Sequence, residues 1–393
     1  MTQSKARSGD VLSRRALSRA TLERQMLLRR RPLPVVEAIK ALVGLQAQVP
    51  GDPYIALWSR LENFRPEELS RLLLNRLVVR ATLMRGTIHL VTTRDFLRLR
   101  PLMQPRLESS PFARDLEGMD MDAFVAAARS ALLERPRTRA ELRALLGESW
   151  PGRDAESLSY AVAYLLPLVQ VTPRGLWGKS GQARWALSED WLGGLPFRST
   201  SLDEVVTRYL GAFGPATVMD IQTWCGLTRL SEVTARLRPK LRVLRDEAGR
   251  ELFDLPDAPR PDPDTESPAR FLPQYDNVFL SHADRARISS EEFGKLMWAA
   301  WMRSESATFR PISSSMFMVD GFLSGAWRID KGPGGAVLSL QPVGKLTKRE
   351  QSELAEEGMG LLSLLAADAG THDVRFVTLD DAVDPRGPRR AMR

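Results

Sequence analysis

The sequence predicts an α+β protein that is mainly helical, in which β-hairpin wings close successive groups of helices. Helical patterns followed by a pair of strands occur three times between residues 34 and 260, a proline-rich stretch then interrupts the pattern, and the remaining sequence favours strands. The 43% hydrophobic fraction of the 393 residues is enough for several cores. We therefore predict three tandem winged-helix motifs followed by a C-terminal β-rich region with one long helix.

The composition favours a polyanionic partner and excludes several classes of protein. The formal charge is +8, and arginine, which suits phosphates and base edges, supplies most of the positive charge. Cys225 is the only cysteine and the three histidines lie far apart, so we expect no disulfide within the chain, no metal site and no cofactor. No apolar run is long enough for a membrane span and no signal peptide opens the chain, so we expect a cytoplasmic, nucleoid-associated protein without membrane contact.

The chain begins with a basic arm, residues 1–33, in which a short helix is expected from about Ser13. This arm either touches nucleic acid or is in part a solvated tail. The first winged-helix region, residues 34–118, opens with an apolar helical pattern that ends near Gly44, and Asp52 is expected to cap the next helix. Its later elements are a helix at 67–75, strands at 77–82 and 87–91, and a helix from 95 to 99.

The same order of elements recurs in the second region, residues 119–198, and in the third, residues 199–260. Helices are expected at 121–133, 139–146, 154–166, 202–213, 217–224 and 231–237, and strands at 168–172, 184–187, 241–245 and 251–255. Thr138 and Glu141 have the spacing of a capping box. Three such motifs on a basic chain indicate DNA binding, although winged helices also serve as protein-docking units.

The last region, residues 261–393, follows a stretch rich in proline and acidic residues. Strands are expected at 270–272, 277–280, 315–319, 322–329, 336–340 and 374–379, and a helix at 291–302. A long helix from 348 to about 368 is expected to begin at Thr347, with Glu350 completing a capping box.

Two glutamines, Gln46 and Gln48, lie where the first helical pattern ends, with one apolar residue between them. If the backbone is extended there, the two amides point the same way, whereas in a helix they lie about 160° apart. The residues alone leave two interpretations open. The amides either satisfy carbonyls at the end of the helix or belong to a functional site.

Several segments together resemble the AlkZ-like winged-helix DNA glycosylases. The segments are LQAQVP at 45–50, PYIALWSR at 53–60, MRGTIHLV at 84–91, LPQYDN at 272–277, DRARI at 284–288 and VDG at 319–321. They occur in the same order over roughly residues 25–380. The resemblance implies three winged helices around a DNA channel, followed by a β-rich part.

The resemblance also implies an activity. The family hydrolyses N-glycosidic bonds of N7-alkylated purines, some members unhook interstrand crosslinks, and its active-site motif is Gln, an apolar residue, then Gln or Asp. Gln46 and Gln48 match the two-glutamine form and are the catalytic candidates. The implied protein is a monomeric, monofunctional DNA glycosylase that acts on double-stranded DNA without an obligate protein partner. Two rivals are a non-catalytic winged-helix regulator and a DNA-processing protein that has lost activity.

Two amides suit this chemistry. A purine alkylated at N7 is cationic, so it can leave without a general acid while the sugar becomes oxocarbenium-like. Carbonyl oxygens aimed at the sugar would stabilise the developing charge and hold the attacking water. Glutamine is a poor base, so the pair is expected to position the water, and we expect hydrolysis without strand cleavage.

Further residues are candidates for DNA contacts. Arg85, Thr87 and His89 alternate along a predicted strand and could share a face toward DNA, or they could belong to an ordinary wing. On the second wing, phosphate contacts are expected from Lys179, Gln182 and Arg184. For Asp276, Asp284 and Arg285 an internal ion-pair network is favoured over a DNA role.

Overall fold

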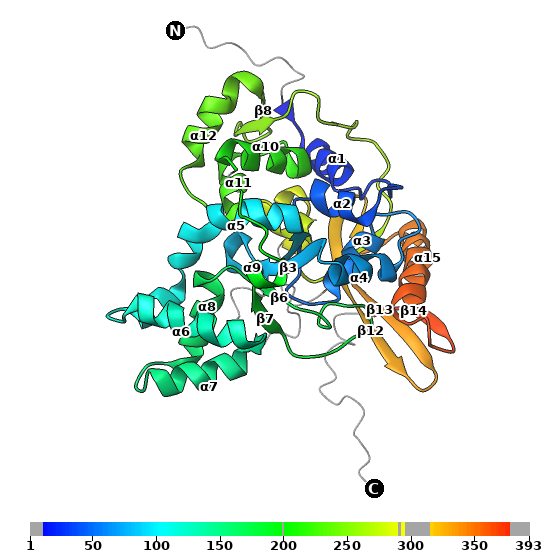
Figure 1. Ribbon diagram of the computed structural model, residues 1–393. Coiled ribbons are helices and arrows are strands. Elements are labelled where there is room, and N and C mark those ends of the chain that lie inside the picture. Colours follow the sequence, from blue (N-terminus) through cyan, green and yellow to red (C-terminus); the bar gives the residue numbers. More distant parts are fainter. Residues whose placement is uncertain (1–10, 199, 290–291, 295–314, 378–393) are drawn as a thin grey trace, which may run out of the picture.

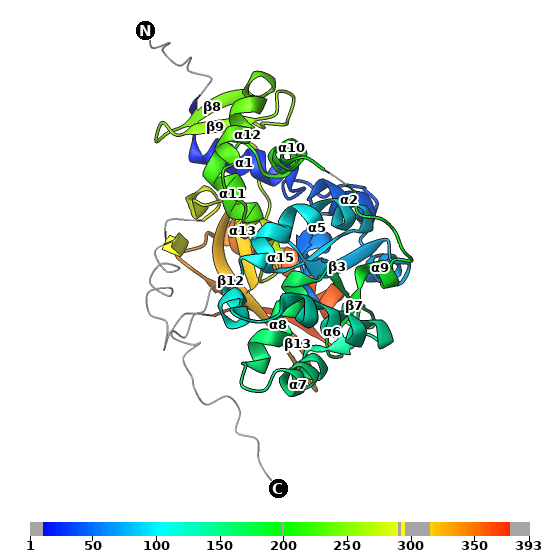
Figure 2. The same cartoon turned by 60° about the vertical axis from the view of Figure 1, so that its left-hand side comes forward.

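The computed structural model describes residues 11–198, 200–289, 292–294 and 315–377. In this part of the chain the strands form three β-sheets, and the helices α6 to α8 lie at the opposite end of the molecule from α10 to α12 in both views (Figures 1 and 2). The α+β prediction is confirmed. The number of winged-helix motifs and the boundaries between the regions stay predictions.

The first part of the chain builds one half of a six-stranded sheet. Its elements are α2 (Val35–Ala41), β2 (Leu45–Gln46), α3 (Asp52–Trp58), α4 (Pro66–Leu74), β3 (Val78–Thr82), β4 (Ile88–Thr92) and α5 (Thr93–Glu108). Strands β3 and β4 form the predicted hairpin, and β2 pairs antiparallel with β4. Helix α5 is much longer than predicted, because it continues through Pro101 and Pro105.

The second hairpin completes the same sheet. Its elements are α6 (Met121–Glu134), β5 (Arg137–Thr138), α7 (Arg139–Ser149), α8 (Ala155–Leu165), β6 (Leu168–Gln170), β7 (Arg184–Leu187) and α9 (Ser188–Trp191). The strand order is β2-β4-β3-β6-β7-β5, because β6 pairs antiparallel with β3. The two hairpins predicted as separate wings are therefore continuous, and one apolar core runs beneath both.

The third group of helices carries its own small sheet. Its elements are α10 (Leu202–Phe213), α11 (Val218–Cys225), α12 (Leu230–Leu237), β8 (Arg242–Asp246) and β9 (Glu251–Asp254). Strand β1 (Val11–Leu12) pairs with β8 in parallel. Helix α1 (Arg14–Arg24) begins about where it was predicted, and the Ser13 side chain caps it. Two of its arginines face inward: Arg19 pairs with Asp320 at 2.5 Å and Arg24 with Asp254 at 2.6 Å.

The C-terminal region is a five-stranded sheet packed against one long helix. Its elements are β10 (Arg270–Leu272), α13 (Asn277–Leu280), β11 (Ser315–Val319), β12 (Phe322–Gly332), β13 (Gly335–Pro342), α15 (Lys348–Leu365) and β14 (His372–Phe376). The strands lie in chain order, and β13 and β14 are parallel. Thr347 and Glu350 form the predicted capping box. Most of the helix predicted at 291–302 lies outside the described residues.

Two local predictions are wrong. Residues 277–280 were expected to be a strand, but they form the short helix α13, which Asp276 caps by accepting a hydrogen bond from the Val278 N–H. Helix α3 begins at Asp52 itself, without a side-chain cap. Both errors occur at residues whose partners are distant in the sequence. Asp276 pairs with Arg60, and Asp52 accepts a hydrogen bond from the Tyr275 N–H.

Candidate active site

The first of the two glutamines lies in β2, the short edge strand of the six-stranded sheet, and Gln48 follows in a bend. Gln46 is opposite His89 in the pairing of β2 with β4, and the Ala47 N–H donates to the Ile88 carbonyl at 2.7 Å. Gly44 makes the turn out of α2 with φ +94°, where a Cβ would lie 2.5 Å from Val91. The backbone is therefore not helical between the glutamines, but the extended strand ends before Gln48.

Both glutamine side chains reach toward the first hairpin. The Arg85 Nη2 donates to Gln46 Oε1 at 2.7 Å, and the Ile88 N–H donates to Gln48 Oε1 at 3.3 Å. Because only an oxygen can accept from these donors, the contacts fix which end of each amide is the carbonyl. Gln46 is 7% exposed, whereas Gln48 is exposed. Gln48 is therefore the amide that a DNA strand can reach.

Arg85 ties Gln46 to a distant part of the fold. It lies in a turn, Met84–Gly86, with φ +57°, and its Nη1 donates to the carbonyl oxygen of Trp224 at the end of α11. Burial lowers the pKa of Arg85 to about 10, so the guanidinium keeps its charge at neutral pH. The alternation predicted for Arg85, Thr87 and His89 along one strand does not form, because β4 begins only at Ile88.

Asn277 clamps the same segment from the C-terminal region. Its Nδ2 donates to the Gly44 carbonyl at 2.7 Å, and its Oδ1 accepts from the Gln46 N–H at 3.3 Å. The neighbouring Asp276 pairs with Arg60 at 2.7 Å, and both side chains are fully buried. This pair bears out the structural interpretation of Asp276. Arg80 holds the segment at Ala47, because its Nη2 donates to the Ala47 carbonyl at 2.7 Å.

Two buried titratable groups flank the segment. Burial lowers the pKa of His89 to about 3, and its neutral ring donates from Nδ1 to the Thr87 carbonyl at 3.0 Å. Burial raises the pKa of Asp52 to about 7, although the Tyr275 N–H donates to its carboxylate. Within the described residues, Asp52 Oδ2 has no hydrogen-bond partner. Neither group carries a full charge beside the glutamines at pH 7.

Beside Gln48 lies a hollow of about 500 Å³, called here the Gln48 hollow. Strands β3, β4, β6 and β7, helices α7 and α8, and the loop of the second hairpin enclose it. Among the residues that the structure describes, its charged lining side chains are Arg139 and Arg174, and no carboxylate lines it. Arg139 pairs with Glu156 at 3.3 Å, so among the described residues Arg174 is the lining arginine without a carboxylate partner.

The remaining predicted DNA contacts lie in different settings, and their role stays a prediction. Gln182 lines the Gln48 hollow, and Lys179 is exposed in the same loop. Arg184 is paired with Glu141 at 3.0 Å. Thr87 donates from Oγ1 to the Met84 carbonyl. His89 is 2% exposed and contacts protein.

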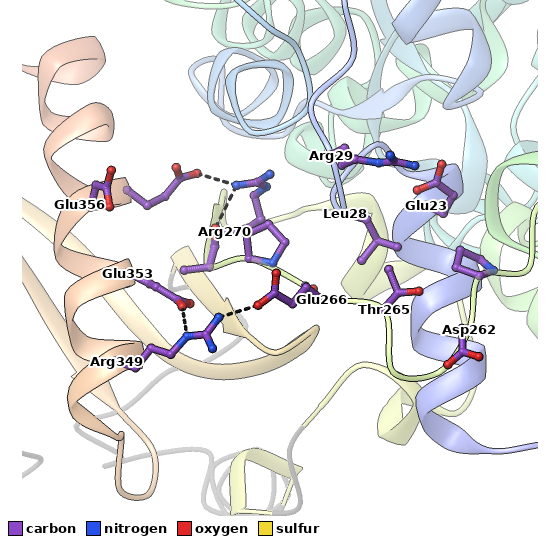
Figure 3. Close-up of a pocket in the computed structure, with 15 residues that line it drawn as sticks. Glu23, Leu28, Arg29, Asp262, Thr265, Glu266, Arg270, Arg349, Glu353 and Glu356 are labelled. Carbon is purple, nitrogen blue, oxygen red and sulfur yellow. Dashed lines mark hydrogen bonds and ion pairs between the residues drawn. The ribbon is translucent and has the colours of Figure 1, made fainter.

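A second, larger hollow lies away from the glutamines, between α1 and α15 (Figure 3). Its volume is about 850 Å³, and we call it the carboxylate hollow. It is lined by three arginines and by the six carboxylates of Glu23, Asp262, Glu266, Glu353, Glu356 and Glu357. In Figure 3, Arg349 bridges Glu353 and Glu266, at 2.8 and 2.6 Å. No cluster of side chains in the described part of the chain could hold a metal ion.

Sequence reasoning missed Asn277, Arg80 and Asp52 as parts of this site. The signal for Asn277 was present, because the segment at 272–277 is one of those that carry the family resemblance. Nothing in the local pattern around Arg80 or Asp52 indicates that they meet the glutamine segment. No helix of the described residues is long and apolar enough to cross a membrane.

The glutamine segment thus lies in a helical fold with β-hairpins, and the comparison with a known family identifies its class. A profile of the family described as DNA glycosylase AlkZ-like matches residues 39–364. The chain belongs to this family. It is also similar in structure to the Streptomyces sahachiroi DNA glycosylase AlkZ, with a TM-score of 0.71 and 21% identity over 93% of this chain and 100% of that one. A search of curated proteins gives no match.

Proposed function

We propose that this protein hydrolyses the N-glycosidic bond of N7-alkylated purines in double-stranded DNA. Membership of the DNA glycosylase family supports the reaction class. The exposed Gln48, beside a hollow that no carboxylate of the described residues lines, supports the proposed location of the active site. The fixed orientation of the two amides is the observation that carries the proposal. Both carbonyl oxygens accept from rigid donors, so their positions are set before substrate arrives.

The two glutamines have different roles in this proposal. Gln48 faces the sugar of the damaged nucleotide, stabilises positive charge at C1′ and holds the attacking water. Gln46 keeps the segment in place, because its amide is buried and bound to Arg85. A carbonyl oxygen has two lone pairs, so the bond from Ile88 leaves Gln48 Oε1 able to accept from water. The cationic base leaves as a neutral purine, and the attacking water gives its hydroxyl to C1′ and releases its second proton to solvent.

The test is incubation with duplex DNA that carries N7-methylguanine, followed by alkaline cleavage of abasic sites. We expect alkali-labile sites at the lesion and intact strands before alkali is added. Retention of the lesion, together with tight binding to one particular undamaged sequence, would instead identify a DNA-binding regulator.

We also propose activity on crosslinks joined at N7. The Gln48 hollow opens at the surface where Gln48 is exposed, so a base tethered to the opposite strand need not enter a closed pocket. A duplex with an N7-linked crosslink should be separated into single strands under the same conditions. Release of N7-methylguanine without unhooking would contradict this extension alone.

A further inference from the structure

The C-terminal sheet ends in a strand whose outer edge is open. Among the edge strands that the structure describes, β1, β2 and β5 span two residues each, β10 is fully buried, and β9 is bridged to Ala216. Strand β14 is longer, at five residues, and three of these are exposed. It lies beside α15 on the right-hand side of Figure 1, and no strand of the described residues pairs with its outer edge.

The hydrogen bonds to β13 show which backbone groups of β14 point outward. The Val377 N–H, just beyond the strand, donates to the Leu340 carbonyl of β13 at 2.8 Å. Because backbone groups alternate in direction along a strand, the odd-numbered residues of β14 bond to β13. The N–H and C=O groups that face the open edge are therefore those of the even-numbered residues, His372, Val374 and Phe376.

The side chains of β14 alternate in the same way. Val374 lies under α15, where a Cβ on Gly358 would be 3.3 Å from Val374 Cγ2. Asp373 and Arg375 lie on the opposite face of the sheet, where they form an exposed ion pair at 2.6 Å. The edge therefore carries one charge of each sign, one on either side of Val374.

Two copies of this edge complement one another in one antiparallel register. With a twofold axis at Val374, this residue lies opposite Val374 of the partner, and the outward backbone groups of the two strands meet. Asp373 is then opposite Arg375 of the partner, and the symmetry repeats this pair. An axis at Asp373 or at Arg375 would instead place like charges opposite each other, which is unfavourable. The charges thus select both the register and a second copy as the occupant of the edge.

We propose that β14 pairs with β14 of a second copy of this chain, in an antiparallel register centred on Val374, so that two five-stranded sheets become continuous. The inference goes beyond the proposed function, and it differs from the monomer that the family resemblance implies. Two five-residue strands bury less surface than a standard interface, so we expect a reversible dimer with a Kd on the order of 10 µM. The Gln48 hollow stays accessible in both copies, because its strands belong to another sheet.

The first test measures the mass of the full chain by sedimentation equilibrium. Over a range of ~1 to ~100 µM, we expect the average mass to rise from near 44.0 kDa, the mass of one chain, to most of twice that value. A mass that stays at that of one chain overturns the proposal. The same result is expected if residues 378–393, rather than a second copy, cover the edge.

The second test reverses the charges beside the axis. Asp373→Arg and Arg375→Asp each place like charges opposite one another, so each should weaken self-association at least ~10-fold. The matched control is Arg328→Asp, because Arg328 forms a comparable exposed pair with Asp330 on β12, inside the same sheet. The control should associate like the parent, and melting curves establish that each variant is folded.

A mixture of the two weakened variants distinguishes pairing across this edge from a general effect of charge. One variant has two basic side chains beside Val374 and the other has two acidic ones, so a pair with one chain of each regains opposite charges at both positions. We expect the mixture to associate about as tightly as the parent. Self-association that neither reversal weakens, or a mixture that stays at the mass of one chain, overturns the assignment of β14 as the interface.

Discussion

The Gln48 hollow and the carboxylate hollow differ in charge more than in size. The carboxylate hollow is the larger, at about 850 Å³, and six carboxylates line it. The Gln48 hollow, at about 500 Å³, has two arginines, and within the described residues no carboxylate lines it. A polyanion is repelled by the first and attracted by the second. Volume alone would select the carboxylate hollow for a DNA-processing site, whereas charge favours the Gln48 hollow.

The arginines of the two hollows also differ in their ion-pair and hydrogen-bond partners. In the carboxylate hollow, Arg349 and Arg270 are paired with glutamates, at 2.6 to 3.3 Å. Arg174 in the Gln48 hollow donates to the Gly181 carbonyl, and its buried Nε has no partner among the described residues. Arg139 of the same hollow is paired with Glu156 at 3.3 Å, so among the described residues Arg174 is the lining arginine without a carboxylate partner. This difference can be tested from the largest expected effect to the smallest.

The largest effect should come from the glutamine pair itself. Loss of one preorganised dipole beside a delocalised charge should cost ~1–3 kcal/mol, or roughly 10- to 100-fold in rate. We expect Gln48→Ala to lose this much in single-turnover release of N7-methylguanine, and Gln46→Ala to approach it, because without the Arg85 contact the segment no longer holds Gln48 in place. The double variant should lose less than the product of the single losses, because Gln46 acts through Gln48. Full additivity would contradict this dependence.

Asn277→Ala should give the next effect, because it removes both hydrogen bonds that hold Gly44 and Gln46. We expect kcat to fall roughly 10-fold with KM little changed, since the variant misplaces the amides without touching DNA. Asn75→Ala, at the exposed end of α4, is the matched control. A folded Asn277→Ala protein with parental kcat would show that the clamp is dispensable.

A smaller effect, on the salt dependence of DNA binding, should distinguish an exposed cation beside the Gln48 hollow from one beside the carboxylate hollow. Lys179 is exposed in the loop that borders the Gln48 hollow, whereas Arg349 borders the carboxylate hollow. Lys179→Gln should lower the slope of log affinity against log salt by about 1. Arg349→Gln should leave the slope unchanged. Equal changes in the two variants would mean that DNA covers both sides.

The smallest effect concerns stability. Because burial raises the pKa of Asp52 to about 7, the folded protein retains a proton that the unfolded chain loses above pH 4. The contribution of Asp52 therefore becomes less favourable as pH rises from about 4 to 7. Asp52→Asn should raise the melting temperature at pH 8 by a few degrees, on the order of 1 kcal/mol, and have less effect at pH 5. A variant that is less stable than the parent at pH 8 would contradict this.

The sequence predicted those features that local residues determine. The capping boxes at Thr138 and Thr347 form because cap and glutamate are three residues apart. The glutamine pair was found because its motif is continuous. Asn277 could not be placed against Gln46 by pattern, because 231 residues separate them. The helix at 277–280 was mistaken for a strand because a short apolar run fits either structure.

The hollows themselves could not be predicted. The Gln48 hollow depends on the pairing of β3 with β6, which joins two hairpins that the sequence presents as separate wings. That pairing places Gln170 opposite Arg80 and brings the second hairpin beside Gln48. No periodicity within either hairpin specifies its partner, so the composition of the hollow appears only in the assembled fold.

The most direct test of where the chemistry lies compares Gln48→Ala with Glu356→Gln on one duplex containing N7-methylguanine. Gln48 borders one hollow and Glu356 the other. In single-turnover reactions at saturating protein, we expect base release by Gln48→Ala to be roughly 10- to 100-fold slower than by the parent, with DNA affinity unchanged. Glu356→Gln should release base at the parental rate. Parental release by Gln48→Ala would contradict the assignment of the active site.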